Sequence, residues 1–236
     1  MRNILITGAS RGIGAAIARE LAGPGTRILV NYLQNEAAAR AAAAAVEAAG
    51  AEAVLVQGDV RSEADLKRMA EVAGPLDVLV HNAAVGALKA WDKIRTPQWD
   101  LTLESSLRPF WLLTKLCTLK PDATVIGISS LGSRRYIPGY VAMGVAKAGV
   151  EALTRQLAVE LAPIRVNTIC AGLVDTDALR YLPEGQKMVE ETAKLTPLGR
   201  IGLPEDVAQA VSLFLDPRAH WITGQVIVVD GGFSVL

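Results

Sequence analysis

The sequence has little of what marks several protein classes. Its 236 residues include only two cysteines, Cys117 and Cys170, too few for a disulfide framework or a zinc site. Lysine plus arginine (24) balances aspartate plus glutamate (24), so charge favours neither nucleic acid nor an anionic membrane as a partner. No uncharged run approaches the ~18 residues of a membrane-spanning helix, and the start of the chain resembles no signal peptide. We therefore expect a cytoplasmic protein without a metal site.

The sequence does contain an alternation of short strand-like runs and longer helical patterns. Hydrophobic residues make up 51% and charged residues 20%, which excludes a disordered chain. Runs rich in isoleucine, leucine and valine predict seven strands, at residues 3–7, 27–32, 52–57, 76–81, 124–128, 165–169 and 225–229. Helices are predicted between them, at residues 14–21, 36–49, 62–73, 98–119, 140–161 and 204–215. This order predicts an α/β fold: one domain, residues 1–236, with a seven-stranded parallel sheet and helices on both faces.

One segment, residues 175–203, is less regular than the rest. It contains two prolines and three glycines, and it has no clear strand or helix period. Long irregular segments in compact α/β domains usually form lids or binding loops. We therefore expect this segment to cover the active site, with residues 179–191 lining a substrate channel.

A glycine-rich turn follows the first predicted strand and opens the first predicted helix. It reads Gly8-Ala9-Ser10-Arg11-Gly12-Ile13-Gly14. Such glycines permit a tight turn and a close approach of the backbone to a pyrophosphate, which then lies at the helix N-terminus. The turn therefore predicts a doubly wound (Rossmann) domain that binds a dinucleotide, although an ordinary strand-to-helix turn is the alternative.

The charges near this turn favour NADP over NAD. An enzyme that binds NAD usually has an acidic residue at the end of the second strand, where it binds the ribose 2′-hydroxyl. Here residues 31–34 read Asn-Tyr-Leu-Gln and contain no carboxylate. Arg11 lies in the turn, where its guanidinium could pair with a 2′-phosphate, although it could also be a solvated surface cation.

Several motifs occur in the order typical of short-chain dehydrogenases/reductases, and the likeness covers nearly the whole chain. They are Gly8-x-x-x-Gly12-x-Gly14, Asn82-Ala83-Ala84, Ser130, Lys147, the run Ala171-Gly172-Leu173-Val174-Asp175-Thr176 and the closing residues 224–232. The resemblance implies that Asp59 and Val60 flank the adenine and that residues 82–84 line the cofactor. It also implies that Gly172 and Val174 help to form the cofactor site, that Thr176 binds the carboxamide side of the nicotinamide, and that Lys147 binds its ribose. Asn82 could instead be only a turn-forming side chain.

The position of the tyrosine departs from the usual family pattern. Most members have Tyr-x-x-x-Lys, but here Met143 lies four residues before Lys147 and Tyr140 lies seven before it. On a helix, residues seven apart are separated by about 700°, so Tyr140 would share the face of Lys147, about 4.5 Å further along the axis than residue 143. This spacing, with residues 129–136 and 175–179, resembles the type III enoyl-acyl-carrier-protein reductases (FabL type). That resemblance implies NADPH dependence.

The displaced tyrosine suits one kind of reduction better than another. When a ketone accepts hydride, the reacting carbon bears the oxygen directly. When an enoyl thioester accepts hydride at its β-carbon, the developing oxyanion lies two carbons further away. We therefore predict NADPH-dependent reduction of the trans-2 double bond of enoyl thioesters, in which Tyr140 donates a hydrogen bond to the enolate oxygen and Lys147 holds the cofactor.

Other polar residues have weaker claims on the site. Ser130, 17 residues before Lys147, matches the family's active-site serine but could merely cap the strand end. Tyr136 is a rival phenol. Ser106 is the expected equivalent of an asparagine that carbonyl-reducing members usually carry, and His81 is interpreted as a core histidine at a strand end.

Two other functions remain open from the sequence. One is a carbonyl reductase or alcohol dehydrogenase of the same family. The other is a catalytically silent NADP-binding protein, in which Met143 marks decay of the site. For the enoyl reductase, the substrate would be an acyl thioester carried on acyl carrier protein or coenzyme A. The family resemblance also implies a homotetramer or homodimer, packed through the predicted helices 98–119 and 140–161.

Overall fold

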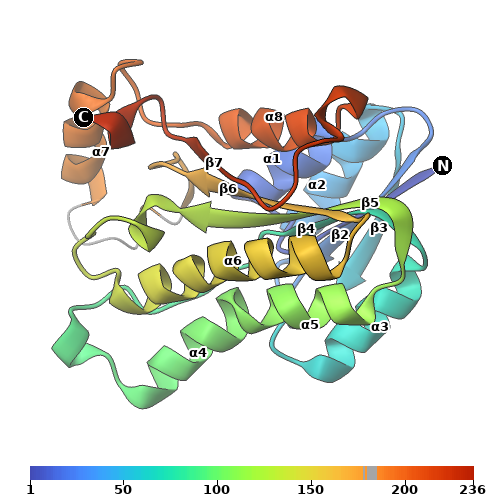
Figure 1. Ribbon diagram of the computed structural model, residues 1–236, viewed down its shortest axis with the longest axis horizontal. Helices are drawn as coiled ribbons and strands as arrows, with labels where there is room; N and C mark the ends of the chain where they lie inside the picture. The colour runs from blue at the N-terminus through green and yellow to red at the C-terminus, as the bar shows by residue number, and fades with distance from the viewer. Residues whose placement is uncertain (178, 180–184) are drawn as a thin grey trace.

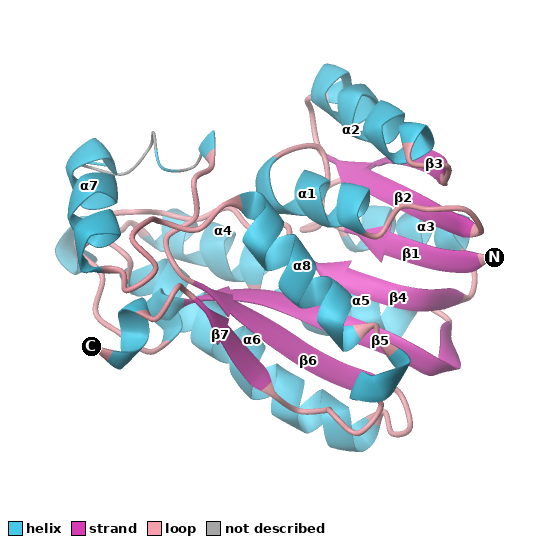
Figure 2. Cartoon of the chain, turned by 90° about the horizontal axis from the view of Figure 1, so that it is seen from above, coloured by secondary structure: helices cyan, strands magenta, loops and turns pink. Residues whose placement is uncertain are grey.

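The structure is a computed structural model that describes residues 1–177, 179 and 185–236. The described residues form one parallel sheet of seven strands in the order β3-β2-β1-β4-β5-β6-β7 (Figure 2). The strands are β1 (Arg2–Ile6), β2 (Thr26–Tyr32), β3 (Glu52–Gln57), β4 (Leu76–His81), β5 (Leu119–Ser130), β6 (Arg165–Ala171) and β7 (Val226–Val229). The predicted doubly wound α/β fold is confirmed.

Helices cover both faces of this sheet (Figure 1). Three of them, α1 (Gly12–Glu20), α2 (Glu36–Ala48) and α8 (Pro204–Phe214), lie above the sheet in that view. Four lie below it: α3 (Glu63–Ala73), α4 (Thr96–Ser106), α5 (Arg108–Leu116) and α6 (Val141–Glu160). This arrangement explains why the strands read as continuous apolar runs, since neither face of a parallel sheet meets water.

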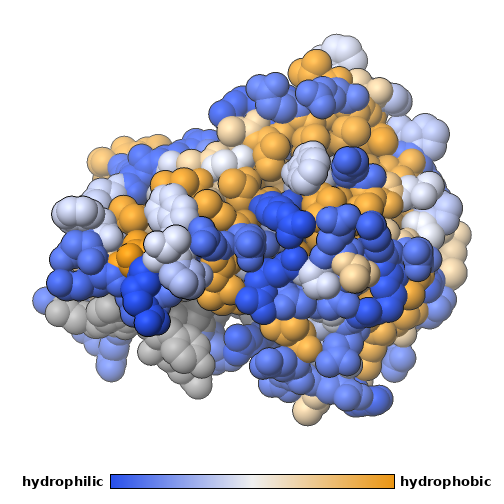
Figure 3. Space-filling model, turned by 90° about the horizontal axis from the view of Figure 1, so that it is seen from below, coloured by the Kyte–Doolittle hydropathy of each residue, from blue (hydrophilic) through white to orange (hydrophobic). Residues whose placement is uncertain are grey.

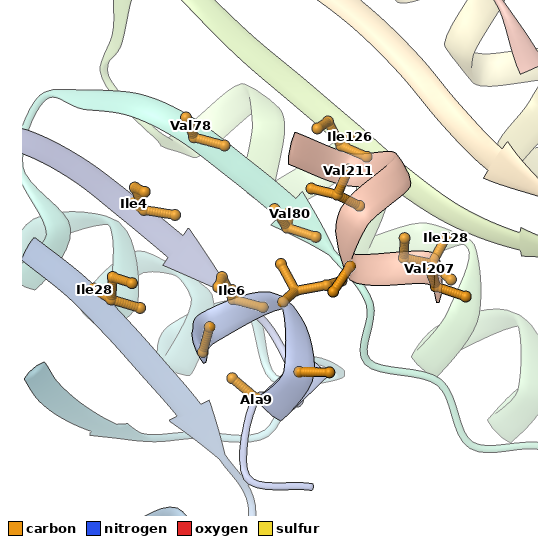
Figure 4. Close-up of a cluster of buried hydrophobic side chains, with 14 of the residues drawn as sticks. Ile4, Ile6, Ala9, Ile28, Val78, Val80, Ile126, Ile128, Val207 and Val211 are labelled. Carbon is orange, nitrogen blue, oxygen red and sulfur yellow. The ribbon is translucent and has the colours of Figure 1, made fainter. Parts of the chain in front are cut away.

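Alternate residues of the strands build two separate cores. On one face, Ile4, Ile28, Val80 and Ile126 pack beneath α1 and α8, as Figure 4 shows. The next residues along the same strands, such as Leu5 on β1, point to the opposite face and pack against α3, α5 and α6. The sheet is thereby held rigid from both sides, and its carboxyl edge is a fixed platform for side chains.

The predicted helix 98–119 is wrong in two respects. It is broken into α4 and α5 at Leu107, whose φ and ψ are −117° and −58°. Pro109, which has no N–H to donate, lies at the start of α5 and prevents continuous helical hydrogen bonding. The end of the prediction also fails, because Cys117 is extended and β5 begins at Leu119, five residues before the predicted strand.

The two ends of the segment 175–203 lie side by side and are joined by backbone hydrogen bonds. The Asp175 N–H donates to the Gly202 carbonyl (2.8 Å), and the Gly202 N–H donates to the Leu173 carbonyl (2.8 Å). The segment was predicted to be irregular, but it contains helix α7 (Gly185–Leu195), which lies beyond the carboxyl edge of the sheet (Figures 1 and 2). Residues 178 and 180–184 lie outside the described residues, and with them part of the predicted channel 179–191. That the segment covers the active site stays a prediction.

A shallow apolar hollow lies between α4, α5 and α6. It is lined by Leu103, Leu107, Trp111 and Leu153, with the charged Glu104 and Arg108 at its rim. Figure 3 looks onto the molecule from this side and shows hydrophobic side chains grouped among hydrophilic ones. Both helices predicted to pack between subunits contribute to the hollow, and the oligomeric state itself stays a prediction. Among the described residues, no helix is long and apolar enough to cross a membrane.

Candidate active site

The predicted site residues gather at the carboxyl edge of the sheet. The strand order reverses between β1 and β4, since β2 and β3 extend to one side of β1 while β5, β6 and β7 extend beyond β4. In open α/β sheets, ligands bind at such a switch point. The glycine-rich turn follows β1, Asn82 follows β4, Ser130 ends β5 and Gly172 follows β6. One edge therefore brings together segments far apart in the sequence.

The glycine-rich turn has the conformation that its glycines were predicted to permit. Gly8 and Gly12 have φ values of 63° and 54°, in the left-handed region that favours glycine. Helix α1 begins at Gly12, and its N-cap residue Arg11 makes no side-chain hydrogen bond to the first turn. The N–H groups at the start of α1 are left available for an anion, while the Arg11 side chain is exposed nearby.

Two side-chain amides, the buried Asn31 and the half-buried Asn82, fix this turn against the neighbouring strands. Asn31 Oδ1 accepts from the Gly8 N–H (3.0 Å), and Asn31 Nδ2 donates to the carbonyls of Val56 and Gly58 (both 3.1 Å). From the other side, Asn82 Nδ2 donates to the carbonyls of Thr7 and Gly8 (both 3.0 Å). The Asn31 amide is therefore fully engaged within the protein, and Asn82 does more than shape its own turn.

Helix α1, the turn and Thr176 can lie this close together because Gly12 and Gly14 have no side chain. A Cβ on Gly14 would collide with the Gly8 carbonyl and lie 2.6 Å from Asn82 Nδ2, so α1 can approach the turn only with glycine there. A Cβ on Gly12 would lie 3.5 Å from the Thr176 methyl group. The structure thus places Thr176, predicted at the nicotinamide, beside the turn predicted at the pyrophosphate.

The remaining predicted cofactor residues line the same edge. Asp59 and Val60 follow β3, and the Asp59 carboxylate pairs with Arg61 (2.6 Å), whose hydrogen bond lowers the pKa of Asp59. Val60 and Val174 are buried, and Ala84 is exposed. Ser10 and Ile13 are half-buried within the turn and the first turn of α1, Ala83 packs against Gly8, and Gly172 packs against Asp230.

One edge of the Tyr140 ring lies against Gly132, close to Ser130. A Cβ on Gly132 would collide with two ring carbons of Tyr140, and a Cβ on Gly144 would lie 2.6 Å from the Gly132 carbonyl oxygen. The Ser130 hydroxyl lies near the Tyr140 hydroxyl and interacts with it. Burial raises the pKa of Tyr140, and the interaction with Ser130 partly opposes that shift. The phenol is therefore held in its protonated, donating form at neutral pH.

The helical-phase argument for Tyr140 does not hold in the structure. Helix α6 begins at Val141, and Tyr140 is its N-cap, with φ and ψ of −104° and 10°. A residue outside the helix has no fixed helical phase relative to Lys147. What positions the phenol is its packing against Gly132 and its interaction with Ser130, which link the end of β5 to the start of α6. Met143, four residues before Lys147, is buried and lies against the position that a Cβ on Gly86 would take (3.1 Å).

Lys147 is buried behind this pair. It is 5% exposed, and its Nζ donates to the Ile128 carbonyl (2.7 Å), two residues before Ser130 on β5. Burial lowers the pKa of Lys147 to about 8, because the apolar surroundings disfavour the charged form. Titratable groups with strongly shifted pKa values gather at functional sites, so Tyr140 and Lys147 together mark a candidate active site.

Two further predicted residues meet beneath the site. His81, at the end of β4, is buried, its ring stacks on Phe110, and its Nε2 lies 3.2 Å from the Ser106 carbonyl oxygen. Burial, with the nearby charge of Lys147 as a smaller cause, lowers the pKa of His81 to about 3. Its Nδ1 has no partner among the described residues. The interpretation of His81 as a core histidine agrees with this burial.

Tyr136, the rival phenol, is 87% exposed.

Comparison with known proteins decides the family. A family model described as "Enoyl-(Acyl carrier protein) reductase" matches residues 8–234. A solved structure of a short-chain dehydrogenase/reductase from Serratia marcescens superposes with a TM-score of 0.92 at 30% identity, covering 99% of this chain and 98% of that one. The chain belongs to the short-chain dehydrogenase/reductase family. It is therefore an oxidoreductase of a fold that binds nicotinamide cofactors.

Two other members of the family show its range. A 1-cyclohexenylcarbonyl-CoA reductase from Streptomyces collinus is 37% identical over 242 residues, which cover 98% of this chain and 86% of the relative. The crystal structure of the angucycline C-6 ketoreductase LanV with bound NADP has a TM-score of 0.90 at 27% identity, covering 100% of this chain and 96% of that one. The family likeness therefore spans more than one kind of reduction.

The residues of this short-chain dehydrogenase/reductase fit a nicotinamide dinucleotide. The uncapped start of α1 suits a pyrophosphate, and the side-chain-free surface at Gly8 and Gly12 lets a ligand approach the backbone. Thr176 lies beside Gly12, where one ligand could touch both. The sequence analysis did not find two residues that shape this site, Asn31 and Glu151. Asn31 was considered only for its lack of charge. Glu151 accepts a hydrogen bond from Ser129, next to Ser130, and its signal in the sequence is a carboxylate one helical turn after the predicted catalytic lysine.

Proposed function

We propose that this short-chain dehydrogenase/reductase reduces the carbon–carbon double bond of trans-2-enoyl thioesters with NADPH. The observation that carries the proposal is the place of the phenol. Tyr140 lies seven residues before Lys147 and interacts with Ser130, while the position four before the lysine holds the buried Met143. The phenol beside Ser130 thus comes from the N-cap of α6 and not from within the helix.

The proposed reaction adds a hydride to the β-carbon and a proton to the α-carbon of the thioester. NADPH supplies the hydride when bound. Tyr140 would donate a hydrogen bond to the thioester oxygen, where negative charge develops as the hydride arrives. Ser130 would keep the Tyr140 hydroxyl oriented toward that oxygen. Lys147, still largely protonated at neutral pH with its pKa of about 8, would bind the nicotinamide ribose and favour an anionic oxygen nearby.

The proposed preference for NADPH rests on charge near the turn. Asn31, at the end of β2, cannot bind a ribose hydroxyl without giving up its bonds to Gly8, Val56 and Gly58. No carboxylate stands at residues 31–34, and Arg11 is exposed beside the turn. A guanidinium there would pair with a 2′-phosphate.

The relatives support an enoyl thioester without deciding it. The name of the Streptomyces collinus relative describes a ring double bond conjugated to a thioester carbonyl, and the matching family model is described as an enoyl reductase. LanV, in contrast, is a ketoreductase. A carbonyl reductase is therefore the second candidate, and the carrier of the acyl group, acyl carrier protein or coenzyme A, is part of the proposal to be tested.

A paired substrate assay tests the proposal. NADPH oxidation is followed with crotonyl-CoA and with acetoacetyl-CoA, and each is repeated with NADH and with the acyl-carrier-protein thioesters. We expect turnover of the crotonyl thioester, with kcat/KM at least about 100-fold above that for the acetoacetyl thioester. Faster reduction of the keto thioester would instead assign a carbonyl reductase. Tight NADPH binding without turnover of either would indicate a silent binding protein.

The role of Tyr140 is tested by removing one oxygen atom. Tyr140→Phe keeps the ring on Gly132 but deletes the donor, so we expect kcat for crotonyl-CoA to fall about 100- to 1,000-fold with KM changed little. Tyr136→Phe is the matched control. The Tyr136 side chain is exposed, so loss of its hydroxyl should leave kcat unchanged. Wild-type turnover by Tyr140→Phe would remove Tyr140 from the mechanism.

A further inference from the structure

Behind the proposed catalytic residues lies a buried carboxylate that the mechanism above does not use. Glu151, on α6 one helical turn after Lys147, is only 6% exposed. A carboxylate in such surroundings is costly unless hydrogen bonds and a countercharge compensate it. Its contacts therefore indicate what it is there to hold.

Three hydrogen bonds join Glu151 to the segment that surrounds Ser130, and the Cys170 thiol on β6 also interacts with the carboxylate. Its Oε1 accepts from the hydroxyls of Ser129 (2.9 Å) and Ser133 (2.6 Å), and its Oε2 accepts from Arg134 Nε (2.9 Å). Ser129 is the residue before Ser130, and Ser133 and Arg134 follow it within four positions. The carboxylate thus binds the chain on both sides of the serine that meets the phenol.

Ser133 and Gly132 connect this cluster to Ser130 itself. The Ser133 hydroxyl lies between Glu151 and the Ser130 carbonyl oxygen (2.7 Å), and its single proton can be donated to either of these acceptors. The Ser130 hydroxyl accepts from the Gly132 N–H (3.4 Å). Gly132 is the residue on which the Tyr140 ring lies. The end of β5 and the short turn after it, residues 129–134, are thereby clamped to α6 through one carboxylate.

We infer that Glu151 is a positioning residue, which acts through residues 129–134 to keep the Ser130 hydroxyl directed at the Tyr140 phenol. The inference rests on the proposed function, since it concerns the same pair of hydroxyls. An ionised carboxylate suits this task because it only accepts hydrogen bonds, so all three of its donors keep one orientation. A glutamine would present an N–H₂ group to one side of the cluster, where Arg134 or the serines need an acceptor.

The test is the variant Glu151→Gln, assayed with NADPH and crotonyl-CoA. We expect kcat to fall about tenfold, with KM for crotonyl-CoA and the dissociation constant for NADPH within about twofold of wild type. Glu160→Gln is the matched control, because it removes an exposed carboxylate from the same helix and should leave all three constants unchanged. A folded Glu151→Gln protein with wild-type kcat would overturn the inference.

A double-mutant cycle separates positioning from general damage. If Glu151 acts through Ser130, then adding Glu151→Gln to Ser130→Ala should lower kcat by less than about twofold beyond Ser130→Ala alone. A further tenfold fall would mean that Glu151 acts by another route, and the inference would be wrong. Should Glu151→Gln fail to fold, Ser133→Ala takes its place in the cycle, since it breaks the bridge but leaves the carboxylate with two donors; the expected fall in kcat is about threefold.

The outcome can be read apart from the proposed function. Wild-type activity with crotonyl-CoA reports on the proposed reaction alone. If the wild type reduces crotonyl-CoA and Ser130→Ala lowers kcat, an unchanged Glu151→Gln enzyme contradicts only the role of Glu151. If the wild type does not reduce crotonyl-CoA, the proposed function fails first, before any variant is compared.

Discussion

The cofactor side and the chemistry side of this site are built in different ways. On the cofactor side, the turn of residues 7–14 is held by bonds to its own backbone, from Asn31 and Asn82. On the chemistry side, Glu151 and Tyr140 interact mainly with other side chains, while the Lys147 ammonium donates to the Ile128 carbonyl. The first construction fixes a path of the chain, and the second fixes the directions of individual donors.

This difference appears in the electrostatics. On the chemistry side burial raises the pKa of Tyr140 and lowers that of Lys147 to about 8, so both shifts favour the neutral form. On the cofactor side the Arg61 hydrogen bond lowers the pKa of Asp59, a shift that favours the charged form. The chemistry side is thus a dry pocket that disfavours charge, whereas charged groups on the cofactor side remain favourable. Substitutions on the cofactor side should therefore change NADPH affinity, and substitutions on the chemistry side should change kcat.

The largest effect is expected on the cofactor side, from Gly14→Ala. The new Cβ would meet the Gly8 carbonyl and Asn82 Nδ2, and neither can yield without moving the turn. Overpacking of this kind costs roughly 3 kcal/mol, so NADPH affinity should fall at least about 100-fold, and the midpoint of thermal unfolding should fall too. Calorimetric titration with NADPH and a thermal melt are the measurements.

The control for that variant is Gly23→Ala. A Cβ at Gly23 meets nothing within 4 Å, so both affinity and melting midpoint should stay at wild-type values. If Gly14→Ala bound NADPH normally, the close approach of α1 to the turn would not matter for binding, and the contrast between the two sides would fail.

On the chemistry side, Gly132→Ala should damage catalysis without damaging binding. Its Cβ would collide with the Tyr140 ring and push the phenol away from Ser130. We expect kcat for crotonyl-CoA to fall roughly 30-fold while NADPH affinity changes less than about twofold, because the atoms nearest to the new Cβ belong to Tyr140 and Ile137 and not to the turn. Stopped-flow turnover and fluorescence titration would measure the two quantities. An equal loss of both would show that the two sides are coupled.

Much of the fold could be predicted from the sequence. The strands were readable because a sheet covered on both faces requires continuous apolar runs, as in β2 and β4. The break between α4 and α5 could have been predicted from Pro109, because proline removes a helical hydrogen bond. Helix α7 was missed because the surrounding prolines and glycines favour loops.

The candidate site was less predictable, and the two sides show why. The cofactor turn follows from glycine spacing, which is local in the sequence. The position of the Tyr140 phenol depends on Gly132 and Ser130, so helical spacing alone gave the wrong reason for it. The hydrogen bonds of Glu151 likewise depend on the end of a strand 21 residues earlier in the sequence. Contacts of buried polar side chains across elements leave no period in the sequence.

The smallest predicted effect concerns stability and sharpens the electrostatic contrast. Lys147 has a pKa of about 8 in the folded chain, against 10.5 when solvated, so between these values the unfolded chain binds the proton more tightly. The free energy of unfolding should therefore gain from Lys147 as pH rises from 8 to 10, by about 2 kcal/mol. Lys147→Met removes this gain while leaving the opposite contributions of Cys117, Cys170 and Tyr140, whose pKa values are raised, in both proteins. Urea unfolding of the two proteins without cofactor at pH 8 and 10 isolates the difference. A constant difference across that range would mean that Lys147 is not desolvated, and the dry pocket on the chemistry side would have to be abandoned.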